Sequence, residues 1–220
     1  MNNILEADSV ILEFDNCWVL YDVYVKCQQG EVVGLLGRNG TGKSCLMKII
    51  LGELSCQGKS IRINKEALIT DKRSHRDMMY LPQNEFIPKQ FKISKVLRHF
   101  DLDFNYLVEC FPEYEKYYNT PLKELSGGEC RIFEIFTVLA SSTKFCLLDE
   151  PFSQIMPIHV EKIKQLIRKE KANKGIIITD HLYEHIIEIC DDIYIIYEGK
   201  TYLMSDVSDI ETLGYARMRN

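Results

Sequence analysis

The 220-residue sequence lacks any hydrophobic run long enough to cross a membrane. Its longest apolar stretches, such as residues 31–36 and 193–197, have the length of strands, whereas a membrane helix needs about 20 apolar residues. The first eight residues also lack the basic region and the apolar segment of a secretory signal. We therefore expect a protein that stays in the cytoplasm.

An excess of positive charge is missing as well. The 27 Lys and Arg residues are outnumbered by 32 Asp and Glu residues, which gives a formal net charge of −5. This balance does not support binding of nucleic acid through bulk positive charge, and we expect no nucleic-acid partner. The eight cysteines include no Cys-x-x-Cys pair, which excludes the common zinc and redox motifs. Several of them lie among apolar neighbours, as Cys146 does, and we interpret these as reduced core residues.

The hydrophobic pattern predicts an α/β fold with a mainly parallel sheet. Strand-like apolar runs alternate with segments of helical periodicity along the chain. The expected strands are residues 31–36, 145–148, 175–178 and 193–197. The expected helices are residues 42–51, a segment from His159 that stops at Gly175, and residues 182–190. No internal repeat or polar linker divides the sequence, so we expect a single domain over residues 1–220.

Residues 83–125 depart from this alternation. They show no strong strand pattern, include three prolines, and carry nine aromatic residues between Phe86 and Tyr118. We interpret the stretch as a small helical insertion, with a helical subdomain at about residues 84–140. Its aromatics are expected to form a compact core for short helices, and an exposed surface for a docking partner is the alternative.

The strongest motif directly follows the first buried strand. Its residues are Gly37, Arg38, Asn39, Gly40, Thr41, Gly42, Lys43 and Ser44, and they fit the phosphate-loop pattern G-x-x-x-x-G-K-[ST]. Glycines let the backbone curl so that successive N–H groups point at phosphate oxygens, and the following helix N-terminus adds partial positive charge. We expect Lys43 to reach the β- and γ-phosphates, Ser44 to ligate Mg²⁺, and the adjacent Cys45 to belong to the same nucleotide site. The alternative is a glycine-rich turn, which the strand–helix context disfavours.

A second motif ends the apolar strand at residues 145–148 with two carboxylates, Asp149 and Glu150. Side chains at the carboxyl end of a buried strand emerge beside the phosphate loop in an open α/β sheet. We expect Asp149 to hold Mg²⁺, largely through water, and Glu150 to orient or deprotonate the attacking water. Because strands commonly end in acidic turns, the functional interpretation of this motif depends on the phosphate loop upstream.

A third motif, Leu-Ser-Gly-Gly-Glu at residues 125–129, precedes a helix expected over Cys130 to Ala140. Two glycines and a serine at a helix start form another arrangement that binds an anion. One nucleotide site does not need a second phosphate-binding helix start. We therefore expect this motif to bind the nucleotide held by another copy of the protein. An ordinary N-cap with a flexible turn is the alternative.

Taken together, these motifs resemble those of the ATP-binding-cassette (ABC) ATPases. The phosphate loop, Gln83, Leu-Ser-Gly-Gly-Glu, Leu-Leu-Asp-Glu-Pro and Asp180-His181 occur in the order and spacing of that family, over essentially the whole chain. The resemblance implies a P-loop NTPase (RecA-like) core, an antiparallel β part near the N-terminus and an inserted helical subdomain that carries the signature.

The resemblance also implies a head-to-tail dimer, with an identical copy or a paralogous ATPase subunit, that sandwiches two ATP molecules. Each ATP then meets the phosphate loop of one copy and the signature of the other, where Ser126, Gly127 and Gly128 contact the γ-phosphate and Glu129 follows. Gln83 matches the loop glutamine that senses Mg²⁺ and water and links the site to a membrane partner. His181 matches the switch histidine, although by its sequence alone it is only a histidine at a strand end.

The family places an adenine-stacking aromatic upstream of the phosphate loop. Phe14 fits that position best, and Trp18 is its rival. A flat ring on the purine contributes about 1–3 kcal/mol, by analogy with base stacking elsewhere. The alternative is that Phe14 is merely a residue of the strand that includes Val10.

Two positions depart from the family pattern. Glu129 stands where the family usually has glutamine, which places another carboxylate near a polyanion but still allows hydrogen bonds from a ribose. Met156 stands where an aspartate usually links the two sites across the dimer, and a thioether neither carries charge nor accepts strong hydrogen bonds. We expect coupling between the sites to be weakened or rebuilt with other groups, while hydrolysis persists because Glu150 and His181 remain.

The resemblance therefore implies an ATP-hydrolysing subunit that drives separate transmembrane permease subunits from the inner face of the cytoplasmic membrane. The stretches at residues 150–153 and 178–182 are most similar to the subfamily of lipopolysaccharide-export and branched-chain amino-acid transporter ATPases. A soluble ABC ATPase of an assembly system, like the iron–sulfur-assembly ATPase, is the alternative. Against it, the residues after Glu129 do not follow that family's basic run.

Overall fold

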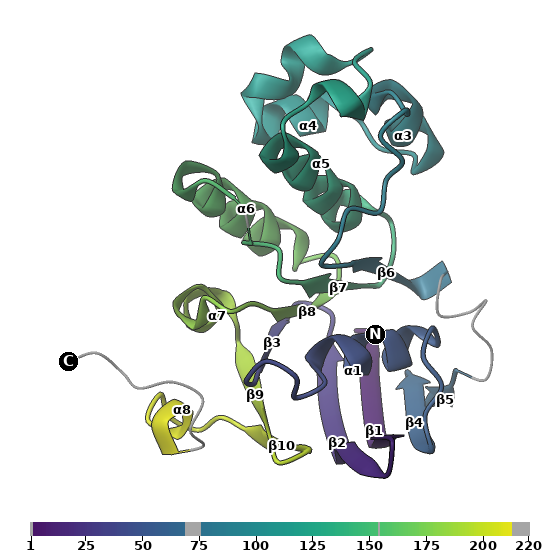
Figure 1. Ribbon diagram of the computed structural model, residues 1–220. Coiled ribbons are helices and arrows are strands. Elements are labelled where there is room, and N and C mark those ends of the chain that lie inside the picture. The colour runs from purple at the N-terminus through teal and green to yellow at the C-terminus, as the bar shows by residue number, and fades with distance from the viewer. Residues whose placement is uncertain (1, 69–75, 154, 213–220) are drawn as a thin grey trace.

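The computed structural model describes residues 2–68, 76–153 and 155–212 (Figure 1). Two sheets organise these residues. The first is antiparallel, in the order β2-β1-β4-β5, and consists of β1 (Ile4–Phe14), β2 (Cys17–Gln28), β4 (Gly58–Ile63) and β5 (Glu66–Ala67). The antiparallel β part expected near the N-terminus is therefore present.

The second sheet has the order β10-β9-β3-β8-β7-β6. Its strands are β3 (Val32–Leu36), β6 (Met78–Leu81), β7 (Phe145–Asp149), β8 (Gly175–Thr179), β9 (Asp192–Tyr197) and β10 (Lys200–Leu203). All neighbouring pairs are parallel except β9 with β10. The four strands expected from apolar runs are confirmed in this sheet.

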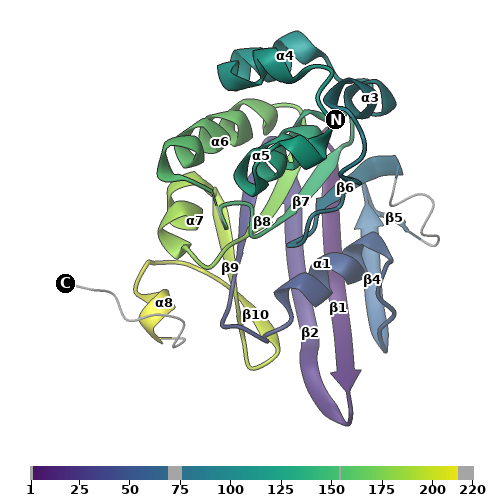
Figure 2. The same cartoon turned by 45° about the horizontal axis from the view of Figure 1, so that its top comes forward.

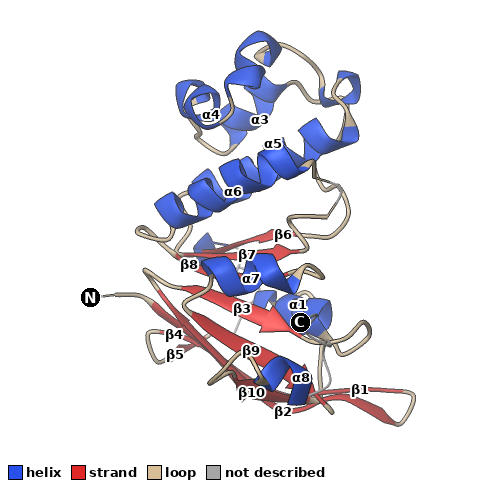
Figure 3. Ribbon diagram, turned by 90° about the vertical axis from the view of Figure 1, so that its left-hand side faces the viewer, coloured by secondary structure: helices blue, strands red, loops and turns tan. Residues whose placement is uncertain are grey.

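Helices cover both faces of the parallel sheet. Along the chain they are α1 (Lys43–Leu51), α3 (Ile93–His99), α4 (Phe104–Cys110), the 3₁₀ segments η1 (Pro112–Tyr117) and η2 (Leu122–Glu124), α5 (Gly127–Ala140), α6 (Pro157–Glu170), α7 (Tyr183–Ile189) and α8 (Asp209–Thr212). Figures 1 and 3 show α5 and α6 over the parallel sheet, with α3 and α4 beyond α5. In the turned view of Figure 2, α1 lies on the side of β1 and β4.

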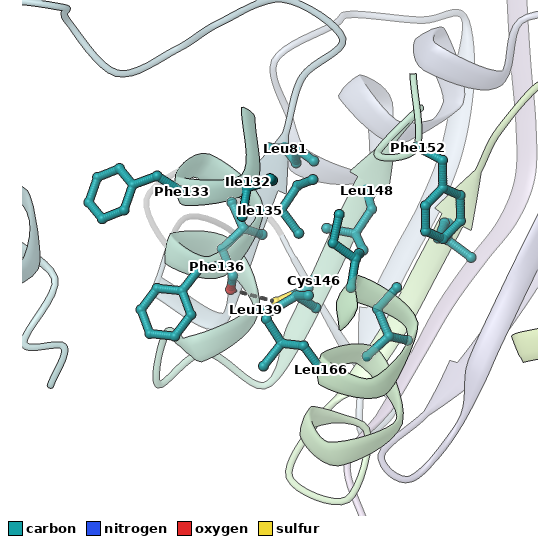
Figure 4. Packing of buried hydrophobic residues seen from close by; sticks show 14 of the residues in the cluster. Leu81, Ile132, Phe133, Ile135, Phe136, Leu139, Cys146, Leu148, Phe152 and Leu166 are labelled. Atoms are coloured by element: carbon teal, nitrogen blue, oxygen red, sulfur yellow. Dashed lines mark hydrogen bonds between the residues drawn. The ribbon is translucent and has the colours of Figure 1, made fainter. Parts of the chain in front are cut away.

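Two hydrophobic cores follow from this layering. Alternate residues of β3 enter different cores, because successive side chains of a strand point to opposite faces. Val33 and Leu35 pack with α1 and the antiparallel sheet, whereas Val32 and Leu36 belong to the core under α5, α6 and α7. Figure 4 shows the second core, where Ile135 and Leu139 of α5 lie on the side of β7 and Phe136 points away from it. The α1 helix is thus buried between the two sheets.

The cysteines are all free thiols. Cys146 is fully buried in the second core, where its thiol donates a hydrogen bond to the Val138 carbonyl at 3.1 Å (Figure 4). Cys27 and Cys130 are buried as well, whereas Cys17 is exposed in the β1–β2 hairpin, so only some of the cysteines are core residues. A hairpin end presents its side chains to solvent whatever their polarity.

Residues 83–125 are helical, as expected, and most of their aromatics lie in the core. Phe111 and Tyr114 are fully buried. Phe86, Phe91, Phe100, Phe104, Tyr106 and Tyr117 are partly buried against the same core. Only Tyr118 of the nine is exposed, at 42%. The aromatics therefore chiefly stabilise short helices, which gain little from backbone hydrogen bonds alone.

Three helix boundaries differ from the expected ones. The helix expected up to Gly175 ends at Glu170, and Gly175 instead opens β8. The helix expected from Cys130 begins at Gly127, because Ser126 caps it. The helical spacing of residues 182–190 places Leu182 and Ile186 on one apolar face, but Leu182 precedes α7 and is 47% exposed. Within the described ranges, no helix is long and apolar enough to span a bilayer.

Gly175 is required by close packing rather than by helix termination. A Cβ at this position would lie 2.7 Å from Cδ1 of Phe145 and 2.9 Å from Sγ of Cys27. Both contacts are shorter than real Cβ contacts, and both neighbours are themselves buried. The first residue of β8 must therefore be glycine for the strands to approach as they do.

We expect Gly175→Ala to lower the free energy of unfolding by about 1–3 kcal/mol, because the methyl overpacks a filled core. Urea unfolding followed by circular dichroism measures the effect. Gly127→Ala is the matched control, since a Cβ there meets nothing within 4 Å. An equal stability of the Gly175→Ala variant and the wild type would contradict this requirement for glycine.

Candidate functional site

The phosphate loop connects β3 to α1. Gly40 and Gly42 adopt left-handed backbone conformations, with φ of 83° and 96°, and Gly42 forms the N-cap of α1. A Cβ at Gly42 would lie 2.9 Å from side-chain carbons of Val19 and Leu20. The loop is therefore pressed against β2, in a shape that side chains at these glycines would prevent.

Lys43 folds back over this loop. Its Nζ donates hydrogen bonds to the carbonyls of Gly37 at 2.6 Å and Arg38 at 3.2 Å, and the residue is 7% exposed. Burial lowers the pKa of Lys43, and the nearby negative charges of Glu150 and Asp149 oppose that shift. The ammonium thus lies at the centre of the loop and faces the carboxylates at the end of β7.

Ser44 and Cys45 occupy the first turn of α1 and are half-buried. Burial raises the pKa of the Cys45 thiol, and Lys48 lowers it to a lesser extent. Cys45 is therefore a neutral thiol near physiological pH, which adds no negative charge beside a phosphate. The sequence-predicted loop residues 37–45 lie together as one segment.

Asp149 ends β7 and is 2% exposed. Its Oδ2 accepts a hydrogen bond from the Tyr80 hydroxyl at 2.9 Å. Its Oδ1 is buried and has no hydrogen-bond partner among the described residues. A buried carboxylate oxygen without a partner lowers stability unless a cation or a water molecule binds to it. Oδ1 of Asp149 is therefore a suitable ligand for Mg²⁺, which prefers oxygen ligands.

Glu150 follows in a left-handed conformation, with φ of 52°. Its amide donates to the Thr179 carbonyl at 2.8 Å, which holds the residue between the ends of β7 and β8. Its Oε1 lies 2.6 Å from Nε2 of His181, and its Oε2 accepts from Nε2 of Gln83 at 2.8 Å and from Oγ of Ser153 at 3.2 Å. The structure thus brings together the three residues predicted to be catalytic.

These residues line an open cleft of about 940 Å³. Its walls are formed by Gln83, Asn84, Glu85, Gly127, Arg131, Glu150, Ser153 and His181. The cleft therefore lies between the carboxyl ends of the strands and the start of α5.

Two buried residues hold the backbone of the site in place: Arg131, which belongs to none of the sequence motifs, and Asp180, which the motifs include without indicating this role. Arg131 of α5 donates to the carbonyls of Pro82 at 2.7 Å, Asp149 at 3.0 Å and Glu150 at 3.3 Å. Asp180 accepts from the amides of Phe152 at 2.9 Å and Leu182 at 3.0 Å, and burial raises its pKa. Their roles depend on distant carbonyls and amides, for which the sequence carries no local signal.

The Ser126–Glu129 segment forms a capping box at the start of α5. The Ser126 hydroxyl accepts from the Glu129 amide at 3.3 Å, and Oε2 of Glu129 accepts from the Ser126 amide at 2.8 Å. Oε1 of Glu129 accepts from the Tyr117 hydroxyl at 2.9 Å. Partial burial opposes the shift, but these bonds hold the pKa of Glu129 below its usual value. Glu129 thus has a structural role within its own chain.

Phe14 and Trp18 lie in the β1–β2 hairpin and are 48% and 55% exposed. Trp18 packs edge-on against Tyr21, with ring centroids 5.6 Å apart. The neighbouring Val19 and Leu20 are the residues that contact the phosphate loop. Either ring is accessible to a base, and the assignment to Phe14 stays a prediction.

Met156 forms the N-cap of α6 and is 62% exposed. Within the described part of the chain, no side chain makes a capping hydrogen bond there. Aspartate is among the best N-cap residues because its carboxylate accepts from the first free amides, which a thioether cannot do well. The departure from the family pattern therefore also removes a local stabilising interaction.

Comparison with known proteins agrees with this geometry. Residues 20–153, more than half of the chain, match the ABC transporter family. The chain therefore belongs to the ABC transporter family, as an ATP-binding protein with ATPase activity.

Its relatives include lipopolysaccharide export system ATP-binding proteins LptB. That of Acidithiobacillus ferridurans is 34% identical over 96% of this chain and 93% of the relative. That of Escherichia coli (strain K12) is 34% identical over 89% and 87% of the two chains. The solved structure of an ATP-binding subunit of an ABC transporter superposes with a TM-score of 0.82 at 23% identity, covering 95% of this chain and 92% of the other. The P-loop NTPase fold is thus confirmed.

We expect Met156→Asp to raise the free energy of unfolding by about 0.5–2 kcal/mol, because the new carboxylate caps α6. Thermal and urea unfolding at neutral pH measure the gain. Met156→Leu, which adds no acceptor, should leave stability unchanged. An equal gain in stability in both variants would show that burial of the side chain, not capping of α6, determines the contribution of this position.

Proposed function

We propose that the protein is the nucleotide-binding subunit of a transporter whose translocation pathway lies in separate membrane subunits. Two copies, or one copy and a paralogous subunit, form a head-to-tail dimer with two ATP molecules between them. ATP binding closes the dimer and hydrolysis reopens it, which drives the membrane subunits between conformations. The observation that carries this proposal is the convergence of Gln83, Glu150 and His181 beside the phosphate loop of an ABC transporter family member.

The chemistry assigned to each residue follows from its position. The loop amides and Lys43 hold the phosphates, and Lys43 acts there as a positive charge rather than as a proton donor. Ser44, Asp149 and Gln83 hold Mg²⁺, consistent with the Oδ1 of Asp149 that is unpaired among the described residues. When bound, Mg²⁺ neutralises charge on the β- and γ-phosphates.

Glu150 accepts the proton of the attacking water. Both of its oxygens are hydrogen-bonded within its own chain, so the carboxylate is oriented and its present partners compete with water for it. Movement of His181 toward a γ-phosphate frees Oε1 at the moment when substrate is in place, whereas Oε2 keeps its bond from Ser153 even if Gln83 moves. This arrangement suppresses hydrolysis until the dimer closes.

The signature acts across the dimer. The Gly127 position is open, since a Cβ there would meet nothing within 4 Å, so a phosphate can approach the backbone. Ser126 exchanges its bond to Glu129 for one to the γ-phosphate of the partner's ATP. Helix α5 then presents its N-terminus to that anion.

A groove receives a cytoplasmic helix of the membrane subunit. It has a volume of about 600 Å³ and lies where α1, β6 and the helical insertion meet. Its lining includes Lys48, Glu53, Met79, Tyr80, His99 and Phe100. Through this contact the protein is held at the inner face of the cytoplasmic membrane.

We expect Glu150→Gln to lower ATP turnover by about 10²- to 10⁴-fold, because the amide cannot accept the water's proton. ATP binding should persist, since the phosphate loop is unchanged. Turnover is measured by phosphate release and binding with a fluorescent ATP analogue. Glu184→Gln, an exposed acid-to-amide change on α7, is the matched control. Turnover of Glu150→Gln at the wild-type rate would refute the role of this carboxylate.

The membrane partner can be captured directly. The tagged Glu150→Gln variant, trapped with ATP in its own cells, should co-purify a polytopic membrane protein from detergent-solubilised membranes. Adding His99→Glu, in the groove wall, should reduce the recovery at least several-fold, whereas the neighbouring Arg98→Glu should not. Recovery of soluble partners alone would contradict the transporter proposal and favour an assembly ATPase.

A further inference from the structure

Tyr80 belongs to the groove and to the nucleotide site at the same time. It lies on β6, at the edge of the parallel sheet. Its side chain lines the groove of about 600 Å³ described above. Its hydroxyl donates to Oδ2 of Asp149 at 2.9 Å. One side chain thus joins the wall of the groove to a carboxylate of the nucleotide site.

The strand register explains this reach. Tyr80 pairs with Leu147 of β7, and Asp149 follows two residues later on the same face of the sheet. Diagonal neighbours of this kind lie within reach of a long aromatic side chain. Tyr80 and Leu147 both pack with the core around α1, so the hydroxyl approaches Asp149 from the side of the phosphate-loop helix.

The bond fixes the orientation of the Asp149 carboxylate. With Oδ2 held by Tyr80, Oδ1 is the oxygen left for a cation. Partners that hydrogen-bond to a metal-holding carboxylate typically change metal affinity by about 10- to 100-fold when removed.

We propose that Tyr80 is a positioning residue that orients Asp149 toward the metal, and that a segment bound in the groove acts on the metal site through this ring. The first part concerns the isolated protein, and the second part rests on the proposed docking of a membrane subunit. Tyr80 thereby provides a physical route from the groove to the nucleotide that does not pass through Gln83.

The first part is tested with Tyr80→Phe, which keeps the ring and removes the hydroxyl. Binding of Mn²⁺ in the presence of a non-hydrolysable ATP analogue is followed by electron paramagnetic resonance, and binding of the analogue without metal by fluorescence. We expect Mn²⁺ affinity to fall about 10-fold and metal-free nucleotide affinity to stay within about twofold. Tyr106→Phe is the matched control, because that hydroxyl also binds a carboxylate, Glu170, away from the nucleotide site.

A double-mutant cycle separates positioning from general loss of structure. If Tyr80 acts through Asp149, Tyr80→Phe has no further effect on Mn²⁺ affinity in an Asp149→Asn background. Wild-type Mn²⁺ affinity in Tyr80→Phe, or an equal loss in both backgrounds, would overturn the inference. Failure of the wild type to bind nucleotide would instead refute the proposed function, so the two failures are distinguishable.

The second part is tested by filling the groove. Ser142 is exposed on its wall, and Ser142→Cys labelled with a bulky maleimide places a group there. The parent protein treated with the same reagent controls for the natural cysteines. We expect the label to change Mn²⁺ affinity several-fold when Tyr80 is present and not in the Tyr80→Phe background. The same change in both backgrounds, or none in either, would overturn the link through Tyr80.

Discussion

The parallel order of four neighbouring strands is the constraint on which the site depends. β3, β8, β7 and β6 lie side by side and run in the same direction. Because their carboxyl ends meet at one edge, the segments that follow them meet as well. The phosphate loop, His181, Glu150 and Gln83 come from four separate parts of the chain, and this edge alone brings them together. Loss of any one strand pairing would separate at least one of these segments from the others.

Side chain to backbone bonds then fix the loops at that edge. Arg131 reaches the carbonyls after β6 and β7, and Asp180 reaches the amides after β7 and β8. Each is buried, so its bonds are made without competition from water. Since Arg131 belongs to α5, the helix that begins with the signature is bonded to the strand end that carries Glu150. The start of α5 and the backbone that carries Glu150, the proposed catalytic base, are therefore joined by direct hydrogen bonds.

The two departures from the family pattern have different physical meanings. Glu129 completes a capping box and accepts from Tyr117, so the carboxylate fits its local structure well. Met156 exposes its thioether at the start of α6, where the described residues provide no side-chain cap. The first substitution preserves the local geometry, while the second removes both a cap and a charge from the expected dimer interface. Both positions stand out in the sequence, but only the structure distinguished them.

The four strands β3, β7, β8 and β9, the phosphate loop and the acidic end of β7 were predictable because each is encoded within a few consecutive residues. Buried strands are continuous apolar runs, and the loop needs glycines at fixed spacing. Two expected helix boundaries were wrong. Gly175 is needed for packing against Phe145 rather than for ending a helix, and Leu182 is exposed to solvent before α7 begins. Neither cause lies in the local sequence.

By itself the sequence predicted a nucleotide-binding loop and the carboxylates expected beside it, because backbone curvature and strand ends are local properties. Only the tertiary structure decided that the oxygens of Glu150 are held by Gln83, Ser153 and His181, and that Tyr80 bonds to Asp149 from the groove. These contacts join residues up to 69 positions apart, and the sheet register that brings them together depends on the packing of the whole core.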